Sequence, residues 1–173
     1  YLQPDFAVDE AKFKIVKNNK IDLKSKKFSL TFSTGVLNHN KQYKRIIKQL
    51  IKLSDKYTFI DSPRIHLGND FIGKLNLTRR FPSEIKKNNI VNNYTINLKK
   101  YLLFLGKTFK ENGVGKVIFF YNRLPYKKRY LSINKKIFYL TFMCTKIPKN
   151  KKLSYNVITK DKSAKKIFKN ILG

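Results

Sequence analysis

The chain is short of acidic residues, and this shortage is its most informative feature. Ten Asp and Glu stand against 39 Lys and Arg, which gives a formal net charge of +29 on 173 residues and a pI near 10.2. Charge of one sign at this density destabilises a compact fold through self-repulsion unless a polyanion neutralises it. The balance is typical of nucleic-acid-binding domains, because each phosphate contact releases condensed counterions.

Cysteine, histidine and clustered carboxylates are equally scarce. The single cysteine, Cys144, excludes an intramolecular disulfide framework, and its apolar surroundings predict a core thiol. His39 and His66 form no familiar metal-ligand spacing with it. The only adjacent acids are Asp9 and Glu10, so acid–base or two-metal catalysis lacks its residues. We expect no enzymatic activity, no cofactor, no metal and no small-molecule substrate.

Long hydrophobic runs are missing as well. The apolar runs, such as residues 101–105, span about five residues against the roughly 18 that a membrane helix needs, so no membrane span is predicted. The chain is nevertheless 42% hydrophobic and 14% aromatic, which is unlike a disordered basic tail. Its length suits one compact domain with its own core.

The composition is also biased among residue types. Lys outnumbers Arg 33 to 6, Ala occurs three times and Trp is absent. Lys, Asn, Ile, Phe and Tyr can be encoded by A and T alone, so the bias predicts an AT-rich genome such as that of an organelle. Base composition explains part of the Lys excess but not the scarcity of acids. The scarcity of acids is therefore the better guide to function.

Apolar periodicity predicts an α+β fold. An extended arm over residues 1–20, with three of the ten acids, precedes a single basic domain over residues 21–173. Strands are predicted at 27–32, 71–78 and 117–121, helices at 40–53, 95–112 and from 163, a hairpin at 130–133 and 137–143, and loops at 58–70 and 79–93. Asn40 and Ser163 are the expected helix caps. The order matches a ferredoxin-like split βαβ core with an added C-terminal hairpin and short helix.

The predicted first helix carries cations around its apolar stripe. Lys41, Lys44, Arg45 and Lys48 occupy positions that the apolar residues leave free. Two interpretations stay open, because these side chains form either an RNA contact or an ordinary solvated helix face.

Three predicted loops, residues 79–93, 122–130 and 146–152, hold the remaining candidate RNA contacts. The segment 122–130 holds four cations and two aromatics in nine residues. Arg pairs with phosphates in a bidentate way, and Tyr stacks on unpaired bases. A solvated strand connection is the alternative reading of that segment. The candidate residues in the three loops are Arg79, Arg80, Lys86, Lys87, Arg123, Tyr126, Lys127, Lys128, Arg129, Lys149, Lys151 and Lys152.

By composition, the whole chain resembles ribosomal proteins of an AT-rich organelle, in particular those of a mitochondrial ribosome. Its layout is similar to that of the tenth small-subunit ribosomal protein family. The similarity lies in a strand, a basic helix, the loop Ser62-Pro63-Arg64-Ile65-His66-Leu67, a strand, a second helix and Gly113-Val114-Gly115-Lys116-Val117-Ile118.

The resemblance implies a structural constituent of the ribosome in the mitochondrion, with rRNA and neighbouring ribosomal proteins as partners. Two alternatives remain. A soluble basic subunit of an organellar membrane complex predicts a basic amphipathic helix with apolar anchors, for which residues 40–53 qualify. A fragment of an intron-encoded nucleic-acid enzyme predicts clustered acids, which the sequence does not show.

Overall fold

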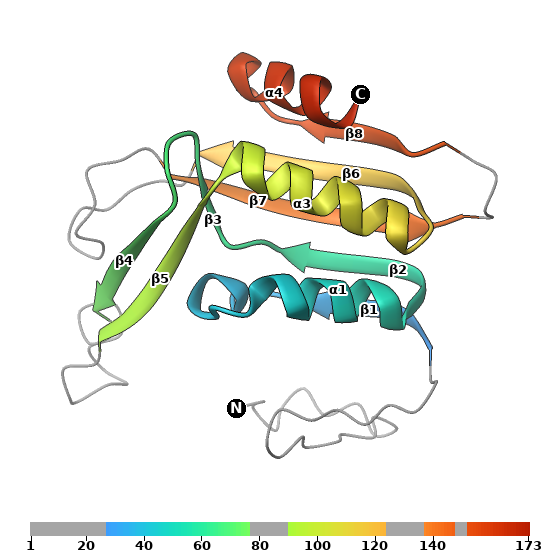
Figure 1. Cartoon of the computed structure of the whole chain (residues 1–173), viewed down its shortest axis with the longest axis horizontal. Helices are drawn as coiled ribbons and strands as arrows, with labels where there is room; N and C mark the ends of the chain where they lie inside the picture. The colour runs from blue at the N-terminus through green and yellow to red at the C-terminus, as the bar shows by residue number, and fades with distance from the viewer. Residues whose placement is uncertain (1–26, 77–89, 124–136, 148–151) are drawn as a thin grey trace.

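The structure, a computed structural model, describes residues 27–76, 90–123, 137–147 and 152–173. Within them the chain forms one mixed β-sheet with helices on one side, which confirms the α+β class (Figure 1). The elements are β1 (Phe28–Ser33), the 3₁₀ helix η3 (Leu37–His39), α1 (Tyr43–Leu53), β2 (Ser54–Asp61), β3 (Arg64–His66), β4 (Phe71–Asn76), β5 (Ile90–Asn97), α3 (Leu98–Glu111), β6 (Val114–Arg123), β7 (Phe138–Lys146), β8 (Ser154–Ile158) and α4 (Lys162–Leu172).

Strand β7 is the shared neighbour in the sheet. One of its edges pairs with β6 along its whole length. The other edge pairs with β3 at Phe138 and with β2 over residues 141–145, and all of these pairings are antiparallel. Outside this centre, β1 pairs with β2, β8 with β6 and β5 with β3, all parallel, and β4 pairs antiparallel with β5. The main sheet therefore runs β1-β2-β7-β6-β8, and β3-β5-β4 form a branch.

The branch begins where the chain bends between β2 and β3. The Ser62 N–H donates to the carbonyl oxygen of Leu140 in β7 at 2.9 Å, so the chain stays hydrogen-bonded to β7 through the bend. Beyond the bend, its outer edge pairs with β5 instead of β1. The Tyr101 hydroxyl of α3 donates to Ser62 Oγ at 2.8 Å within the buried region, which fixes the bend from the helix side.

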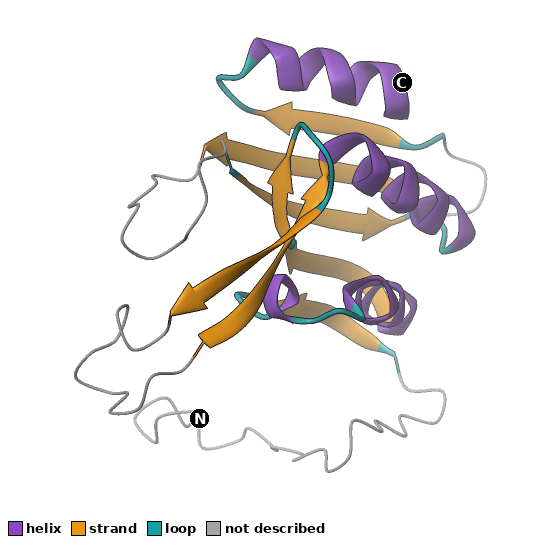
Figure 2. Ribbon diagram, turned by 60° about the vertical axis from the view of Figure 1, so that its left-hand side comes forward, coloured by secondary structure: helices purple, strands orange, loops and turns teal. Residues whose placement is uncertain are grey.

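All three long helices pack against the same face of the main sheet (Figures 1 and 2). Tyr43, Ile47 and Ile51 of α1 recur at helical spacing and are buried, as the apolar stripe predicts. At the other side of the sheet, Phe168 of α4 lies 5.0 Å from the ring of Phe119 in β6. Burial of these stripes supplies most of the stability of the helices, because isolated helices of this length are marginal in water.

Most predicted elements exist, with shifted ends. The strands at 27–32, 71–78, 117–121 and 137–143 and the three helices correspond to described elements. The predicted partner of β7 at residues 130–133 lies outside the described residues, as does the arm at 1–20, and in the structure β7 forms its hairpin with β6.

Two predicted loops were wrong in part, and four strands, β2, β3, β5 and β8, were missed. The segment 58–70 contains the end of β2 and all of β3, and residues 90–93 of the second loop begin β5. Strand β8 was not predicted. Pairing with β3 and β4 stabilises the Asn-rich β5 despite its low strand propensity, because tertiary context overrides that propensity.

The split βαβ prediction needs a correction of position. The predicted second strand, β4, lies in the branch beside β5. The strand that directly follows α1 is β2, a parallel neighbour of β1. The split arrangement occurs later in the chain, where β2 and β6 flank β7 and α3 lies in the connection between them.

The predicted helix caps were also misplaced. Asn40 Oδ1 accepts from the Gln42 N–H at 2.7 Å, so it closes the turn before α1 and not the helix itself. Helix α4 is capped by Asp161, whose Oδ1 accepts from the Ala164 N–H at 3.0 Å, and Ser163 lies inside the helix. Asp161 is one residue outside the helix, where a side-chain acceptor can reach the free N–H groups of the first turn.

Candidate nucleic-acid interface

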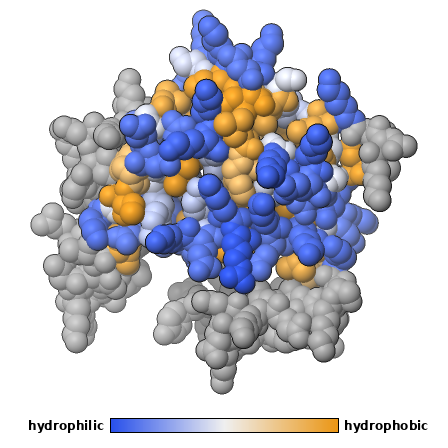
Figure 3. Space-filling view, in the orientation of Figure 1, coloured by the Kyte–Doolittle hydropathy of each residue, from blue (hydrophilic) through white to orange (hydrophobic). Residues whose placement is uncertain are grey.

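The three long helices present a surface rich in cations, which we call the basic helical face. They lie next to one another across the sheet, and Figure 3, which looks onto them, shows many hydrophilic side chains together with a hydrophobic patch in its upper centre. Leu103 of α3 is an exposed apolar residue. Because the apolar stripe of each helix faces the core, the remaining positions point to solvent. Each helix contributes four exposed cations: Lys44, Arg45, Lys48 and Lys52 from α1, Lys99, Lys100, Lys107 and Lys110 from α3, and Lys162, Lys165, Lys166 and Lys169 from α4.

Two carboxylates oppose these cations: Glu111 at the end of α3, and Asp70 in the turn before β4, whose Oδ2 lies 3.1 Å from Lys100 Nζ. Glu111 at the end of α3 lies 3.5 Å from Lys48 Nζ of α1 and 3.8 Å from Lys107 Nζ. All three side chains are well exposed, so the pairs contribute little to stability. Two carboxylates against twelve cations leave most of the positive charge of the face without a counter-charge among the described residues.

The four cations predicted on the first helix segment are exposed, as a phosphate contact requires. Lys44 Nζ lies 5.6 Å from the ring centroid of Phe104, so the side chain leans from α1 towards α3. Lys48 reaches Glu111 on the same side, whereas Lys41 lies in the turn before the helix. The structure thus brings Lys44 and Lys48 together with the cations of α3.

Most other predicted contacts lie outside the described residues. These are Arg79, Arg80, Lys86, Lys87, Tyr126, Lys127, Lys128, Arg129, Lys149 and Lys151, and Arg123 is described only as the last backbone position of β6. Lys152 is exposed just before β8, away from α1. The cations of α3 were missed in the sequence, although the apolar spacing of that helix already placed them on its outer side.

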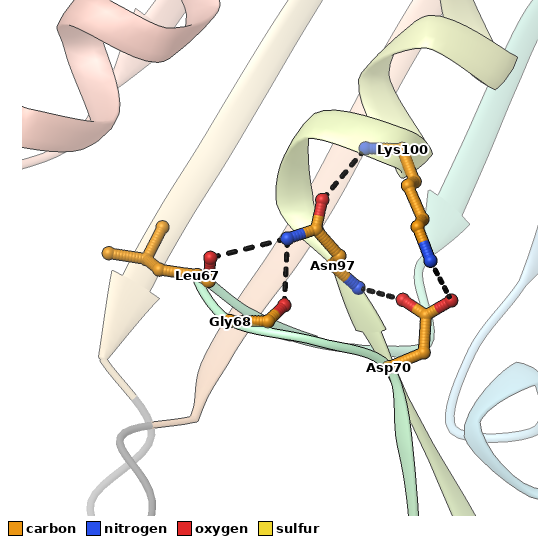
Figure 4. Close-up of polar contacts among 5 residues, drawn as sticks. All are labelled: Leu67, Gly68, Asp70, Asn97 and Lys100. Atoms are coloured by element: carbon orange, nitrogen blue, oxygen red, sulfur yellow. Dashed lines mark hydrogen bonds and ion pairs between the residues drawn. The ribbon is translucent and has the colours of Figure 1, made fainter.

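A polar clamp holds the beginning of α3 beside the basic helical face (Figure 4). Asn97 Oδ1 caps the helix by accepting from the Lys100 N–H at 3.0 Å, and Asn97 Nδ2 donates to the carbonyl oxygens of Leu67 and Gly68 at 3.2 and 2.7 Å. Asp70 accepts from the Asn97 N–H at 2.6 Å and from Lys100 Nζ at 3.1 Å.

Two opposing effects set the ionisation of Asp70. Burial favours the neutral acid, but the hydrogen bond from Asn97 and the nearby Lys100 and Lys44 ammonium groups outweigh it, so the pKa of Asp70 lies below its usual value. Asp70 therefore stays ionised at neutral pH, and it ties the turn before β4 to the start of α3.

The opposite face of the main sheet has a different character. No helix among the described residues covers it, and alternate strand residues place large apolar side chains on it, which we call the apolar sheet face. Its members include Leu30, Phe32, Tyr57, Phe59, Ile118 and Phe120. Within the described strands of the main sheet, Lys116 is the one cation on this side. Sequence reasoning missed this face, although β7 alternates apolar residues on one side with a mixed row on the other.

Cys144, His39 and His66 each contact neighbouring residues of the fold. Cys144 is buried in β7, and its pKa is raised to about 12 because burial outweighs a hydrogen bond with Thr58 and the nearby Lys146. His39 bonds through Nδ1 to the Asn92 carbonyl oxygen at 2.7 Å, and the ring of His66 lies 5.5 Å from that of Phe71. The core thiol predicted at Cys144 is confirmed.

Searches of the described residues for two further kinds of site gave negative results. No group of three His, Cys, Asp or Glu side chains in this part of the chain could hold a metal ion. None of the described helices combines the length and hydrophobicity needed to cross a membrane. Comparison with protein-family models, curated proteins and solved structures found no match to this chain. The surface chemistry of the two faces therefore carries the functional argument.

Proposed function

We propose that the chain is a structural constituent of a mitochondrial ribosome and that it binds rRNA through the basic helical face. The observation that carries this proposal is the presence of four exposed cations on each of three adjacent helices against the two carboxylates of Glu111 and Asp70. An RNA backbone supplies closely spaced phosphates that can neutralise such a face, and release of their counterions drives the binding. The composition of the chain and its AT-type residue bias support the organellar ribosome as the source of that RNA.

Helix α1 also bears on the membrane alternative. That alternative needs the apolar stripe of α1 as an anchor, but Tyr43, Ile47 and Ile51 are buried against the sheet and α3. The surface that α1 presents to solvent is cationic. A polyanion bound at this surface by charge alone fits the geometry better than insertion into lipid.

Salt titration of RNA binding tests the basic helical face. The triple variant Lys44→Gln, Lys48→Gln and Lys107→Gln should weaken binding to a fluorescent RNA hairpin. It should also flatten the dependence of log K on log salt by about 0.9 for each phosphate that the variant no longer neutralises. The matched control replaces Lys56, Lys74 and Lys116, which are exposed off the three helices, and removes the same charge. Equal effects of the two triple variants would contradict the proposal for this face.

Sedimentation tests the assignment to a ribosome. The endogenous protein should travel with ribosomal particles at low salt and leave them only at high salt, since phosphate contacts are screened. Recovery in a membrane complex that contains no RNA would overturn the assignment.

A further inference from the structure

We propose that the apolar sheet face docks a second protein, one that presents an apolar surface bordered by acidic side chains. This inference rests on the sheet and not on the RNA contact. The basic helical face and the apolar sheet face lie on opposite sides of the same sheet, so both can be occupied at once (Figure 2).

Strand register places the apolar residues in adjoining rows. One row runs across four strands from Phe32 through Phe59 and Met143 to Ile118. The row on one side contains Leu30 and Tyr57, and the row on the other contains Phe120 and Ile158. Five strands about 4.8 Å apart make the face about 24 Å wide.

These side chains are open to solvent to an unusual degree. The exposed fractions are 65% for Phe32, 46% for Tyr57 and 36% for Phe120. Single exposed apolar residues are ordinary, but a contiguous patch of several side chains marks an interaction site, because its burial is favourable in proportion to its area. The patch also reaches β1, an edge strand that pairs only with β2 among the described strands.

The charges of this face favour a protein over RNA. Lys116 is the one cation that the described strands of the main sheet place on this side. The guanidinium of Arg64 in β3 is buried and stacks 4.1 Å from the ring centroid of Tyr139, so phosphates find few partners here. Asp61 places a carboxylate on the same side, where its two oxygens accept from the Thr141 hydroxyl at 3.3 Å and from the Gly35 N–H at 3.2 Å. A fixed carboxylate repels a phosphate backbone, whereas an apolar protein surface pairs well with the neighbouring Phe59 and Phe120.

The net charge argues against a second copy of this chain and for an acidic border on the partner. Two copies brought face to face would each carry +29. At the end of the sheet where β1 begins and β7 ends, Lys116 and Lys146 outnumber Asp55, whereas the Lys27 ammonium donates to the Lys52 carbonyl oxygen of α1 on the helix side. Acidic side chains around the partner's apolar surface would complement these cations and steer its approach.

Site-directed photo-crosslinking in extract of the source cells tests the proposal. Cys144 is buried with 2% of its surface exposed, so a cysteine introduced at the surface of the full chain can be labelled selectively with a benzophenone maleimide. Phe32→Cys and Phe120→Cys report on the apolar sheet face, and Gln49→Cys, exposed on α1, reports on the basic helical face. We expect positions 32 and 120 to attach to the same polypeptide, in adducts that resist ribonuclease, and position 49 to attach to RNA.

Affinity measurements then test whether the face binds that polypeptide directly. The crosslinked partner is identified by mass spectrometry and produced separately, and its dissociation constant for the full chain is measured. Phe120→Lys should weaken binding by at least about tenfold, because a charge is placed within an apolar contact. The matched control Gln49→Lys should change it less than about twofold, and thermal melting verifies that both variants fold.

The outcomes that overturn the proposal differ from those that overturn the RNA contact. Nuclease-sensitive adducts at positions 32 and 120 would make the sheet a base-binding surface. Adducts to another copy of the chain would make it a dimer interface, and the absence of adducts would show that nothing docks there. Equal affinities of the Phe120→Lys and Gln49→Lys variants would also overturn it. A lack of RNA adducts at position 49 would count against the basic helical face alone.

Discussion

Tyr101 and Ser62 show what a single pair of side chains does at the bend between β2 and β3. Both are buried, and the Tyr101 hydroxyl is the donor that satisfies Ser62 Oγ from the helix layer. Burial also raises the pKa of the Tyr101 hydroxyl, so the group stays protonated and remains a donor. The contact links α3 to the point at which the sheet divides.

Removal of this hydroxyl should destabilise the protein. Tyr101→Phe leaves Ser62 Oγ buried without its donor, and we expect a loss of about 1 to 2 kcal/mol in the free energy of unfolding. Urea unfolding measures the change. Tyr57→Phe removes a hydroxyl from an exposed ring and should change stability by less than about 0.5 kcal/mol. Similar losses in the two variants would show that the buried Tyr101–Ser62 hydrogen bond adds no stability beyond that of an exposed hydroxyl.

Asp70 should make the stability depend on pH. Its pKa is lower in the folded protein than the ordinary value of 3.8, so it binds protons less readily than in the unfolded chain. The stabilisation it provides is present above the ordinary pKa and is lost as pH falls through the lowered pKa. Asp70→Asn should therefore be less stable than the unmodified chain at neutral pH, and this difference should shrink towards about pH 2. A difference that stays constant over this range would contradict the clamp.

At the scale of elements, the sequence predicts helices better than strand partners. The stripes of α1 and α3 and the left-handed Gly113, with a φ of 66°, indicate where those helices lie and where α3 ends. Strand β5 was hidden, because pairing with strands distant in sequence compensates for its poor propensity. The α1 cations of the candidate site could be predicted from the same stripe, but their proximity to α3 depends on tertiary packing.

The sequence favours Ser163 as the cap of α4, whereas the structure has Asp161 as the cap. Asp161→Ala should cost about 1 kcal/mol of stability, because the Ala164 N–H is left without its acceptor. Asp161→Asn keeps an acceptor and should be close to neutral in its effect. Ser163→Ala, at the position that the sequence favoured, should change stability by less than about 0.5 kcal/mol. Urea unfolding of the three variants provides the measurement, and a larger effect at Ser163 than at Asp161 would identify Ser163 as the cap.

At the scale of the whole molecule, a net charge of +29 opposes folding, because the compact state brings like charges together. The only Lys–carboxylate pairs that we observe among the described residues involve Glu111 and Asp70. Solvent ions and bound partners must therefore screen or neutralise the remaining repulsion between the cations.

Salt should stabilise the isolated protein for this reason. Raising sodium chloride from about 0.05 M to about 0.5 M shortens the screening length severalfold, so the melting temperature should rise. A variant with Lys162, Lys165, Lys166 and Lys169 changed to Gln carries less charge and should respond less. A melting temperature that falls with salt, or an equal response in the variant, would show that self-repulsion does not control the stability.

The position of β7 has a consequence for how the chain folds. Strand β7 is the partner of β2, β3 and β6, and the Asp61–Thr141 contact alone joins residues 80 apart in sequence. Contacts of such long sequence separation slow folding, since a large loop must close before they form. During synthesis, β1, α1 and β2 are complete long before β7 is made. The emerging chain therefore holds β2, β3 and β6 with an edge unpaired until residue 146 is available, and this interval is when a chaperone would be most useful to it.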